Sequence, residues 1–141
     1  MRRRILALDI GTVRIGVAVS DPLGMFAPGI AVLSAESAWM EELDALVRNY
    51  DPETLLLGVP VRTSGVRGPE AQRIEECGRI LAERYPTVKI VLHDERFSTV
   101  MATQALLEGD VSRKNRKGKV DKVAAALILQ SWLDRTGGGA V

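Results

Sequence analysis

Three acidic residues of this chain lie beside apolar segments, where an isolated charge is costly to bury. Asp9 interrupts the apolar run 6–10, Glu95 follows the apolar segment 88–92, and Asp121 begins a long apolar segment. Each has an ordinary structural interpretation: a strand-end acid, a loop acid that pairs with a neighbouring base, or a helix cap. Singly, none of them identifies a chemistry.

Taken together, the three acids predict a metal site. Carboxylates brought into one pocket repel one another and raise one another's pKa unless cations compensate them. Oxygen ligands without a cluster of histidines or cysteines favour Mg²⁺ or Mn²⁺ over Zn²⁺. Two such ions, roughly 3.5–4 Å apart, can activate water and stabilise the leaving oxygen of a phosphodiester. These residue types therefore predict metal-dependent phosphodiester hydrolysis.

The single histidine and the single cysteine indicate structural roles. His93 follows an apolar strand, a position more typical of a structural or surface imidazole than of a proton carrier. Cys77 falls on the apolar stripe of an expected helix, which favours a packed thiol over a nucleophile. A lone cysteine excludes an internal disulfide and fits a reducing compartment.

Charge distribution points to one basic segment. The formal net charge is only +1, so global charge does not predict a nucleic-acid partner. Between residues 113 and 122, however, six basic residues accompany one acid. We expect this segment to be a loop, and its two interpretations, solubilising or phosphate-contacting, are about even.

The elements that must position these residues follow from hydrophobic periodicity. Strands are expected at 4–10, 14–20, 25–33, 54–59 and 88–92, and helices at 39–50, 69–85, 99–107 and 121–133. Three strands joined by short turns, then strands alternating with helices, predict a mixed α/β sheet with helices on its faces. The length fits one domain, 1–136, followed by a flexible Gly-rich tail, 137–141.

The chain is expected to be cytoplasmic, with no membrane partner. The basic start, residues 1–4, is similar to that of an export signal, but Asp9 cuts the apolar run behind it. No small-residue cleavage site follows. No segment approaches the length needed to span a membrane.

Four motifs resemble the YqgF family, also called the RuvX family, over almost the whole chain: LALDIGTVRIGVAVSD (6–21), LLLGVP (55–60), DERFST (94–99) and VDKVAAALILQSWLD (120–134). The resemblance implies a ribonuclease-H-like fold whose mixed five-stranded sheet has the order 3-2-1-4-5, with strand 2 antiparallel and helices on both faces. It also implies that Asp9, Glu95 and Asp121 are the catalytic, metal-binding carboxylates.

Two positions depart from the family pattern. The loop after Pro60 lacks the Asn- or Asp-containing, Gly-rich sequence that such proteins often carry, and Lys122 stands where a small or polar residue is common. Basic residues near the motifs are candidate phosphate contacts: Arg14, Arg62, Arg67, Arg96, Arg113, Lys114, Arg116, Lys117 and Lys119.

The resemblance implies a nuclease that acts on RNA, in maturation of the 5′ end of pre-16S ribosomal RNA. A Holliday junction resolvase acting on branched DNA is the alternative, and it should be a twofold dimer. A non-catalytic RNA-binding module is a third interpretation. The segment Asp9-Ile10-Gly11-Thr12 also resembles the phosphate loop of actin-like and sugar-kinase ATPases, which need two such domains. Monomer and homodimer, Mg²⁺ and Mn²⁺, and endo- and exonucleolytic cleavage all stay open.

Overall fold

The computed structural model describes residues 4–23, 25–59, 68–94 and 113–135, with the backbone alone for Asp94 and for 113–123. The strands of this part are β1 (Ile5–Ile10), β2 (Arg14–Val19), β3 (Gly29–Ser34), β4 (Thr54–Val59) and β5 (Lys89–Asp94). Its helices are α1 (Trp39–Tyr50), α2 (Pro69–Arg84) and α4 (Arg113–Arg135).

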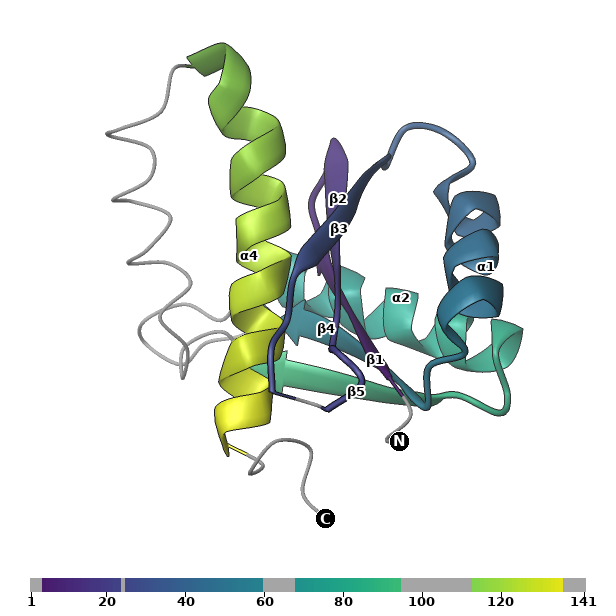
Figure 1. Cartoon of the computed structure of the whole chain (residues 1–141). Helices are drawn as coiled ribbons and strands as arrows, with labels where there is room; N and C mark the ends of the chain where they lie inside the picture. The colour runs from purple at the N-terminus through teal and green to yellow at the C-terminus, as the bar shows by residue number, and fades with distance from the viewer. Residues whose placement is uncertain (1–3, 24, 60–67, 95–112, 136–141) are drawn as a thin grey trace.

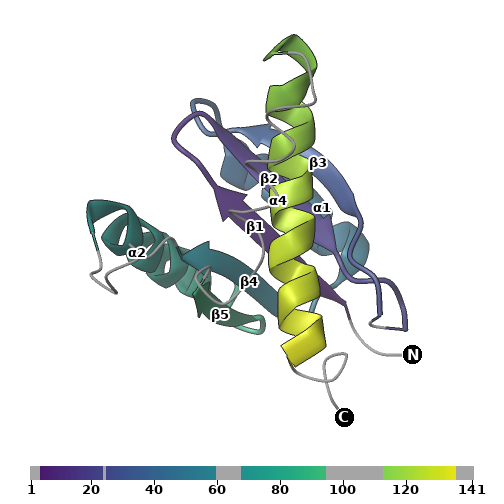
Figure 2. The same cartoon turned by 90° about the vertical axis from the view of Figure 1, so that its left-hand side faces the viewer.

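The five strands form one mixed sheet, in the order β3-β2-β1-β4-β5. β2 is antiparallel to β1 and to β3, whereas β4 runs parallel to β1 and to β5. Helix α4 covers one face of the sheet, and α1 and α2 cover the other (Figure 1). Turned by 90°, α4 lies across β1 and β2 while α2 follows β4 and β5 (Figure 2). The expected sheet order and strand directions are thus confirmed.

Each face of the sheet has its own apolar cluster, and β1 contributes to both. Leu6 and Leu8 belong to the cluster beneath α1 and α2, whereas Ile5 and Ala7 belong to the cluster beneath α4. This is the alternation of a strand buried on both faces. On β1, odd-numbered positions therefore face α4.

Helices α1 and α2 match their expected bounds closely, and their ends have local causes. Pro69 occupies a first-turn position of α2, where its missing N–H costs nothing. Helix α1 ends at Asp51, which adopts a left-handed conformation with φ of 46° and donates its N–H to the Val47 carbonyl. The two helices are joined by Arg84, whose Nε donates to Asp44 Oδ1 at 2.9 Å, while the Tyr85 hydroxyl donates to the same carboxylate.

The contact between the two helices can be tested by measuring the free energy of unfolding at acidic pH. Hydrogen bonds from Arg84, and then from Tyr85, lower the pKa of Asp44 from 3.8 to about 2. A carboxyl group with a depressed folded pKa stabilises the fold above its unfolded pKa and loses that contribution as pH falls toward the folded value. Urea unfolding from about pH 5 to about pH 2 should therefore show a steeper loss of stability in the wild type than in Asp44→Asn. Equal slopes would contradict the prediction.

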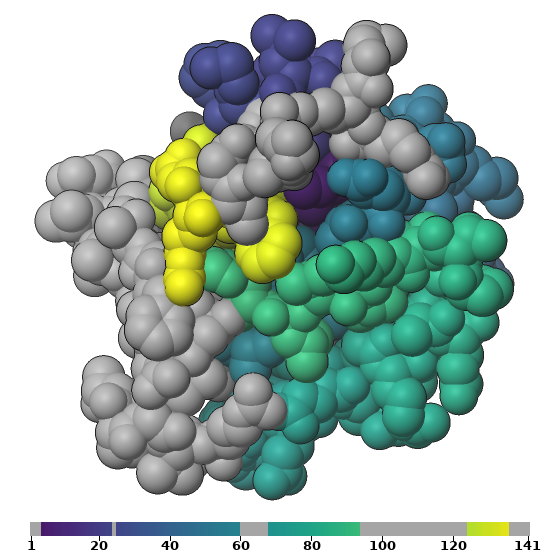
Figure 3. Space-filling model, turned by 90° about the horizontal axis from the view of Figure 1, so that it is seen from below, coloured from purple at the N-terminus to yellow at the C-terminus, as the bar shows by residue number. Residues whose placement is uncertain are grey.

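The third expected strand, 25–33, is wrong in its first half. Met25 and Phe26 belong to the β2–β3 connection, where their N–H groups donate to Asp21 Oδ1 at 2.7 and 3.1 Å. The carboxylate closes a loop that leaves these two side chains 58% and 66% exposed. In Figure 3 this connection is the blue-violet region at the top of the view. From Gly29 onward β3 is an edge strand with a register shift opposite Val17 and Ala18, as Pro28 and Gly29 indicated.

Two further boundaries also differ from expectation. β5 continues past residue 92 to Asp94, because Gly58 and Val59 of β4 pair with His93 and Asp94. Residues 113–119, expected as a loop, are the first turns of α4, so Asp121 lies inside the helix and not at its start. Lys and Arg are good helix formers. Gly118 destabilises the helix by only about 1 kcal/mol relative to Ala, and the packing of the apolar C-terminal half of α4 against the sheet can offset this loss.

Two expected segments cannot be compared with the structure. The expected helix 99–107 and the tail 137–141 lie outside the described residues. Within the part of the chain that is described, no helix combines the length and the apolar character needed to cross a membrane.

Candidate active site

The carboxyl ends of β1, β4 and β5 lie at one edge of the sheet, because the three strands are parallel. We call this the carboxyl edge; it consists of Asp9 and Ile10, Gly58 and Val59, and His93 and Asp94. The edge is where ligands of open α/β sheets tend to bind. The antiparallel strand β2 starts here too, after the short turn that follows β1.

Asp9 lies on the α4 face of the carboxyl edge and is half-buried. It shares that face with Ile5 and Ala7, which pack beneath α4. Its partner across the β1–β2 ladder is Gly16. On the other side the β1–β4 register pairs Leu8 with Leu57, so the residue following in β4 is Gly58. The β1–β4 register ends at that pair, so the one residue paired with Asp9 in the described sheet is Gly16, which has no side chain to fill the space on that side.

The turn after Asp9 depends on Gly11. Its N–H donates to the Arg14 carbonyl at 2.9 Å, which closes the β1–β2 hairpin. A Cβ atom at Gly11 would stand 2.7 Å from that same backbone oxygen. The missing side chain therefore allows the turn to close tightly directly after the acid.

The packing of the described side chains of β5 shows which of its positions face α4. Val91 packs in the cluster beneath α4, whereas Ile90 packs in the cluster on the opposite face. The His93 ring lies edge-on to Trp132 of α4, with centroids 5.8 Å apart, and its Nε2 lies 3.3 Å from Ser131 Oγ. Odd-numbered positions of β5 therefore face α4. Glu95 itself lies outside the described residues.

His93 has the structural role that the sequence favoured. Its side chain is 5% exposed and packs between β5 and α4. Cys77 is likewise a packed thiol: it is half-buried against the cluster beneath α1 and α2. Burial raises the pKa of Cys77, although Arg73 opposes the shift. A thiol with a raised pKa is a weak nucleophile at neutral pH.

The backbone of Asp121 is described, and it lies within α4. It precedes Ala124 and Ala125 by three and four residues, and both alanines are fully buried against the sheet. Positions separated by three or four residues share one face of a helix. The helical repeat therefore brings the Asp121 position onto the face of α4 that packs against the sheet.

Of the candidate phosphate contacts, Arg14 is the one with a described side chain. It is the first residue of β2 and lies half-buried at the carboxyl edge. Gly16 opposes Asp9 and Ala18 packs beneath α4, so even-numbered positions of β2, Arg14 included, face α4. Arg113, Lys114, Arg116, Lys117 and Lys119 have helical backbone, and Arg62, Arg67 and Arg96 lie outside the described residues.

Sequence reasoning missed two residues at this edge. Gly16 carries no chemistry of its own, and only the sheet register reveals that it opposes Asp9. Arg73 of α2 donates from Nη2 to the Ile10 carbonyl and from Nη1 to the Gly11 carbonyl, each at 3.4 Å. Residue 73 is far from residue 10 in the chain, so no local pattern signals this contact.

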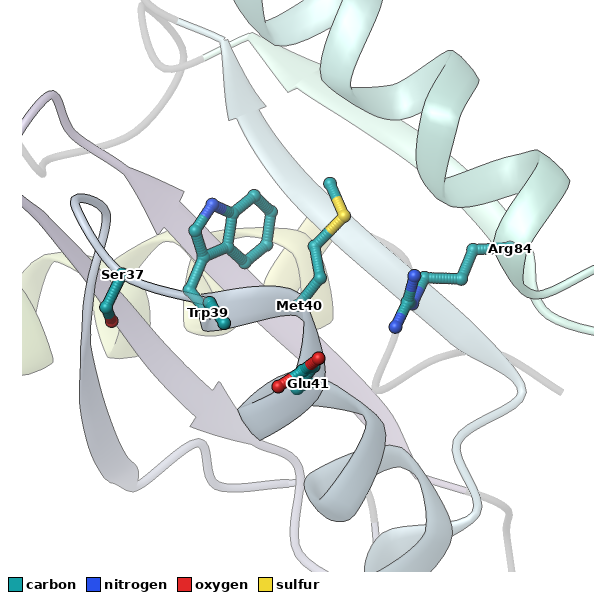
Figure 4. A pocket seen from close by; sticks show the side chains of 6 residues that line it. Ser37, Trp39, Met40, Glu41 and Arg84 are labelled. Carbon is teal, nitrogen blue, oxygen red and sulfur yellow. The ribbon is translucent and has the colours of Figure 1, made fainter.

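A hollow of about 360 Å³ lies elsewhere, at the start of α1 (Figure 4). Trp39 and Met40 line it from α1, and Arg84 faces them from α2. Arg84 is already paired with Asp44. The hollow holds none of the predicted site residues. Among the side chains that the structure describes, no three His, Cys, Asp or Glu residues gather closely enough to hold a metal ion.

Comparison with known families gives one match along most of the chain. A family model described as "RuvX: Holliday junction resolvase" matches residues 3–135. A Clostridium botulinum protein (strain Eklund 17B / Type B) named "Putative pre-16S rRNA nuclease" is 45% identical over 134 residues, covering 94% of this chain and 97% of the relative.

Two solved structures share the fold at low identity. The fowlpox virus Holliday junction resolvase is 15% identical and superposes with a TM-score of 0.55, covering 94% of this chain and 98% of its own. RuvC of Thermus thermophilus, solved with a Holliday junction, is 12% identical with a TM-score of 0.53 and covers 96% and 97% of the two chains. Both likenesses support the ribonuclease-H-like fold.

Proposed function

This chain belongs to the RuvX family of Holliday junction resolvases, and we propose that it is a metal-dependent nuclease that hydrolyses phosphodiester bonds in RNA. The observation that carries the proposal is the placement of Asp9 on the α4 face of the carboxyl edge, opposite Gly16 of β2. A carboxylate held there, next to a residue without a side chain, is suited to bind a cation and admit a phosphate. The function places the protein inside the cell.

We propose that Asp9, Glu95 and Asp121 hold Mg²⁺ or Mn²⁺. The described neighbours support this set. Glu95 directly follows Asp94 in the sequence, and Asp94 ends β5 at the carboxyl edge. Asp121 shares a helix face with Ala124 and Ala125, which pack against the sheet. Oxygen donors of this kind favour hard divalent ions.

When bound, such ions lower the pKa of water and stabilise the charge on phosphate oxygens; a two-ion arrangement does both at once. The protein supplies the frame. The sheet holds Asp9, and the packing of α4 on the sheet holds the helix that carries Asp121. Arg14, on the same face as Asp9, is proposed to orient a substrate phosphate, because guanidinium groups match phosphate geometry.

The further basic residues are proposed to bind the nucleic-acid backbone: Arg62, Arg67, Arg96, Arg113, Lys114, Arg116, Lys117 and Lys119. Five of these residues lie in the first turns of α4, where the backbone is helical. Such contacts give affinity that falls with salt and carries little sequence information.

RNA is favoured over branched DNA as the substrate, because the chain is more similar in sequence to a protein named for pre-16S rRNA than to the Holliday junction resolvases of known structure. The relative that is 45% identical over nearly its whole length is named for pre-16S rRNA. The structures of Holliday junction resolvases share the fold at 12–15% identity. We therefore propose 5′-end maturation of pre-16S ribosomal RNA as the task. Resolution of branched DNA is the second candidate, because the matching family model carries that description.

Cleavage assays separate the two substrates. The purified protein, with Mn²⁺ or Mg²⁺, is expected to cut a 5′-extended 16S precursor RNA faster than a four-way DNA junction of equal nucleotide concentration. Chelation with EDTA should stop cleavage, and Mn²⁺ should restore it. Faster, symmetric cutting of the junction by a dimeric protein would favour the resolvase, and no RNA cleavage at any metal concentration would refute the proposal.

A further inference from the structure

Arg73 extends the contacts of helix α2 to the end of β1. Helix α2 packs on β4 and β5. From there the Arg73 guanidinium reaches the end of β1, donating to the Ile10 and Gly11 carbonyls at 3.4 Å. These two residues directly follow Asp9. The contact therefore ties the strand that bears Asp9 to the helix that backs β4 and β5.

The Arg73 contact lies at the end of β1, where the strand still pairs with β2 but no longer with β4. The register of β1 with β4 runs from Ile5 to Leu8, whereas its register with β2 continues to Ile10. Arg73 supplies its donors beyond the end of the β1–β4 ladder. It approaches from the α2 side, whereas Asp9 lies on the α4 face. The guanidinium thus acts on the main chain without occupying the space beside the carboxylate.

We propose that Arg73 is a positioning residue for the metal site. By holding the Ile10 and Gly11 carbonyls, it sets the end of β1 relative to β5 and so sets Asp9 relative to the other metal ligands. This inference rests on the proposed function, since it takes Asp9 as a ligand. It requires the fork of a guanidinium, because the two carbonyls are bonded by two different nitrogens.

The first test measures the strand end itself, in metal-free protein. Amide hydrogen exchange over residues 9–14 should be at least about 3-fold faster in Arg73→Ala than in the wild type, because two main-chain restraints are lost. Arg79→Ala is the matched control: Arg79 is an exposed arginine of the same helix that pairs with Glu76 and Glu83 within α2. It should leave this exchange unchanged. Equal exchange in all three proteins would overturn the inference.

The second test measures the consequence for metal binding. Calorimetric titration with Mn²⁺ alone should show about 3- to 10-fold weaker binding in Arg73→Ala, an effect of the size that a supporting residue produces. Arg73→Lys keeps the charge but lacks the fork, so its affinity should resemble that of Arg73→Ala. Arg79→Ala should bind as the wild type does, and circular dichroism should show equal folding.

The outcomes separate this inference from the proposed function. If wild-type protein binds Mn²⁺, Asp9→Asn does not, and Arg73→Ala binds normally, the positioning role fails while the metal site stands. If wild-type protein binds no Mn²⁺, the metal site fails, and the role in metal positioning fails with it. If Arg73→Lys matches the wild type while Arg73→Ala loses RNA affinity with a smaller salt dependence, Arg73 contacts phosphate instead, and the inference is overturned.

Discussion

Replacement of Asp9 by Asn is expected to lower nuclease activity by at least about 100-fold at saturating Mn²⁺, with the fold preserved. The amide keeps the size of the side chain and removes the negative charge that a cation needs. Gly16, which opposes Asp9 across the β1–β2 ladder, has no side chain that the amide could contact. Initial rates of cleavage of a precursor RNA measure the effect.

The matched control is Asp134→Asn. Asp134 is an exposed acid in the last turn of α4, where it accepts a hydrogen bond from Gln130 Nε2 at 3.0 Å. It should retain nearly full activity. Loss of cleavage by Asp9→Asn with retained RNA binding would support catalysis over a non-catalytic RNA-binding module. Full activity of Asp9→Asn in a clean preparation would assign the cleavage to another site or to a contaminant.

Replacement of Ile128 by Ala is expected to cost about 2–5 kcal/mol of unfolding free energy. Ile128 is fully buried in the cluster that joins α4 to the sheet, beside Ala125 and Leu129. The loss of three carbon atoms leaves a cavity at the interface that holds α4 in place. Urea unfolding at neutral pH measures the change. Because α4 carries Asp121, affinity for Mn²⁺ should fall as well.

Ile80→Ala makes the same chemical change at a partly exposed position. Ile80 lies on α2 and is 39% exposed. It should cost clearly less than the change at Ile128, since part of the side chain is already in contact with solvent. Similar losses of stability at the two positions would show that α4 is not held by this cluster.

Local periodicity predicted most of the secondary structure. The bounds expected for α1 and β4 agree with the structure, because these segments combine a clear apolar period with turn residues at their ends. Three boundaries were wrong because partners outside the segment decided them. Asp21 draws Met25 into a loop, pairing with β4 extends β5 to Asp94, and docking of the apolar half continues α4 back to Arg113.

The candidate site was predictable as a set of residue types, not as a geometry. Asp9 was recognisable because a charge interrupts an apolar strand. Its neighbour Gly16 was not, because the two residues meet only through the register of β1 and β2. Arg73 was hidden for the same reason: its two acceptors lie more than sixty residues earlier in the chain. Asp9, Glu95 and Asp121 all stay predictions as metal ligands.

By itself, the order of residues determined the type and approximate position of most strands and helices that the structure describes, and the acids available to bind a metal. Those features depend on neighbours within a few positions, through side-chain alternation in strands and the repeat of a helix. Only the tertiary structure decided which face of β1 carries Asp9, what stands beside it, and which helix holds the strand end. Such contacts join segments distant in sequence, and they form only when the sheet and its two apolar clusters assemble.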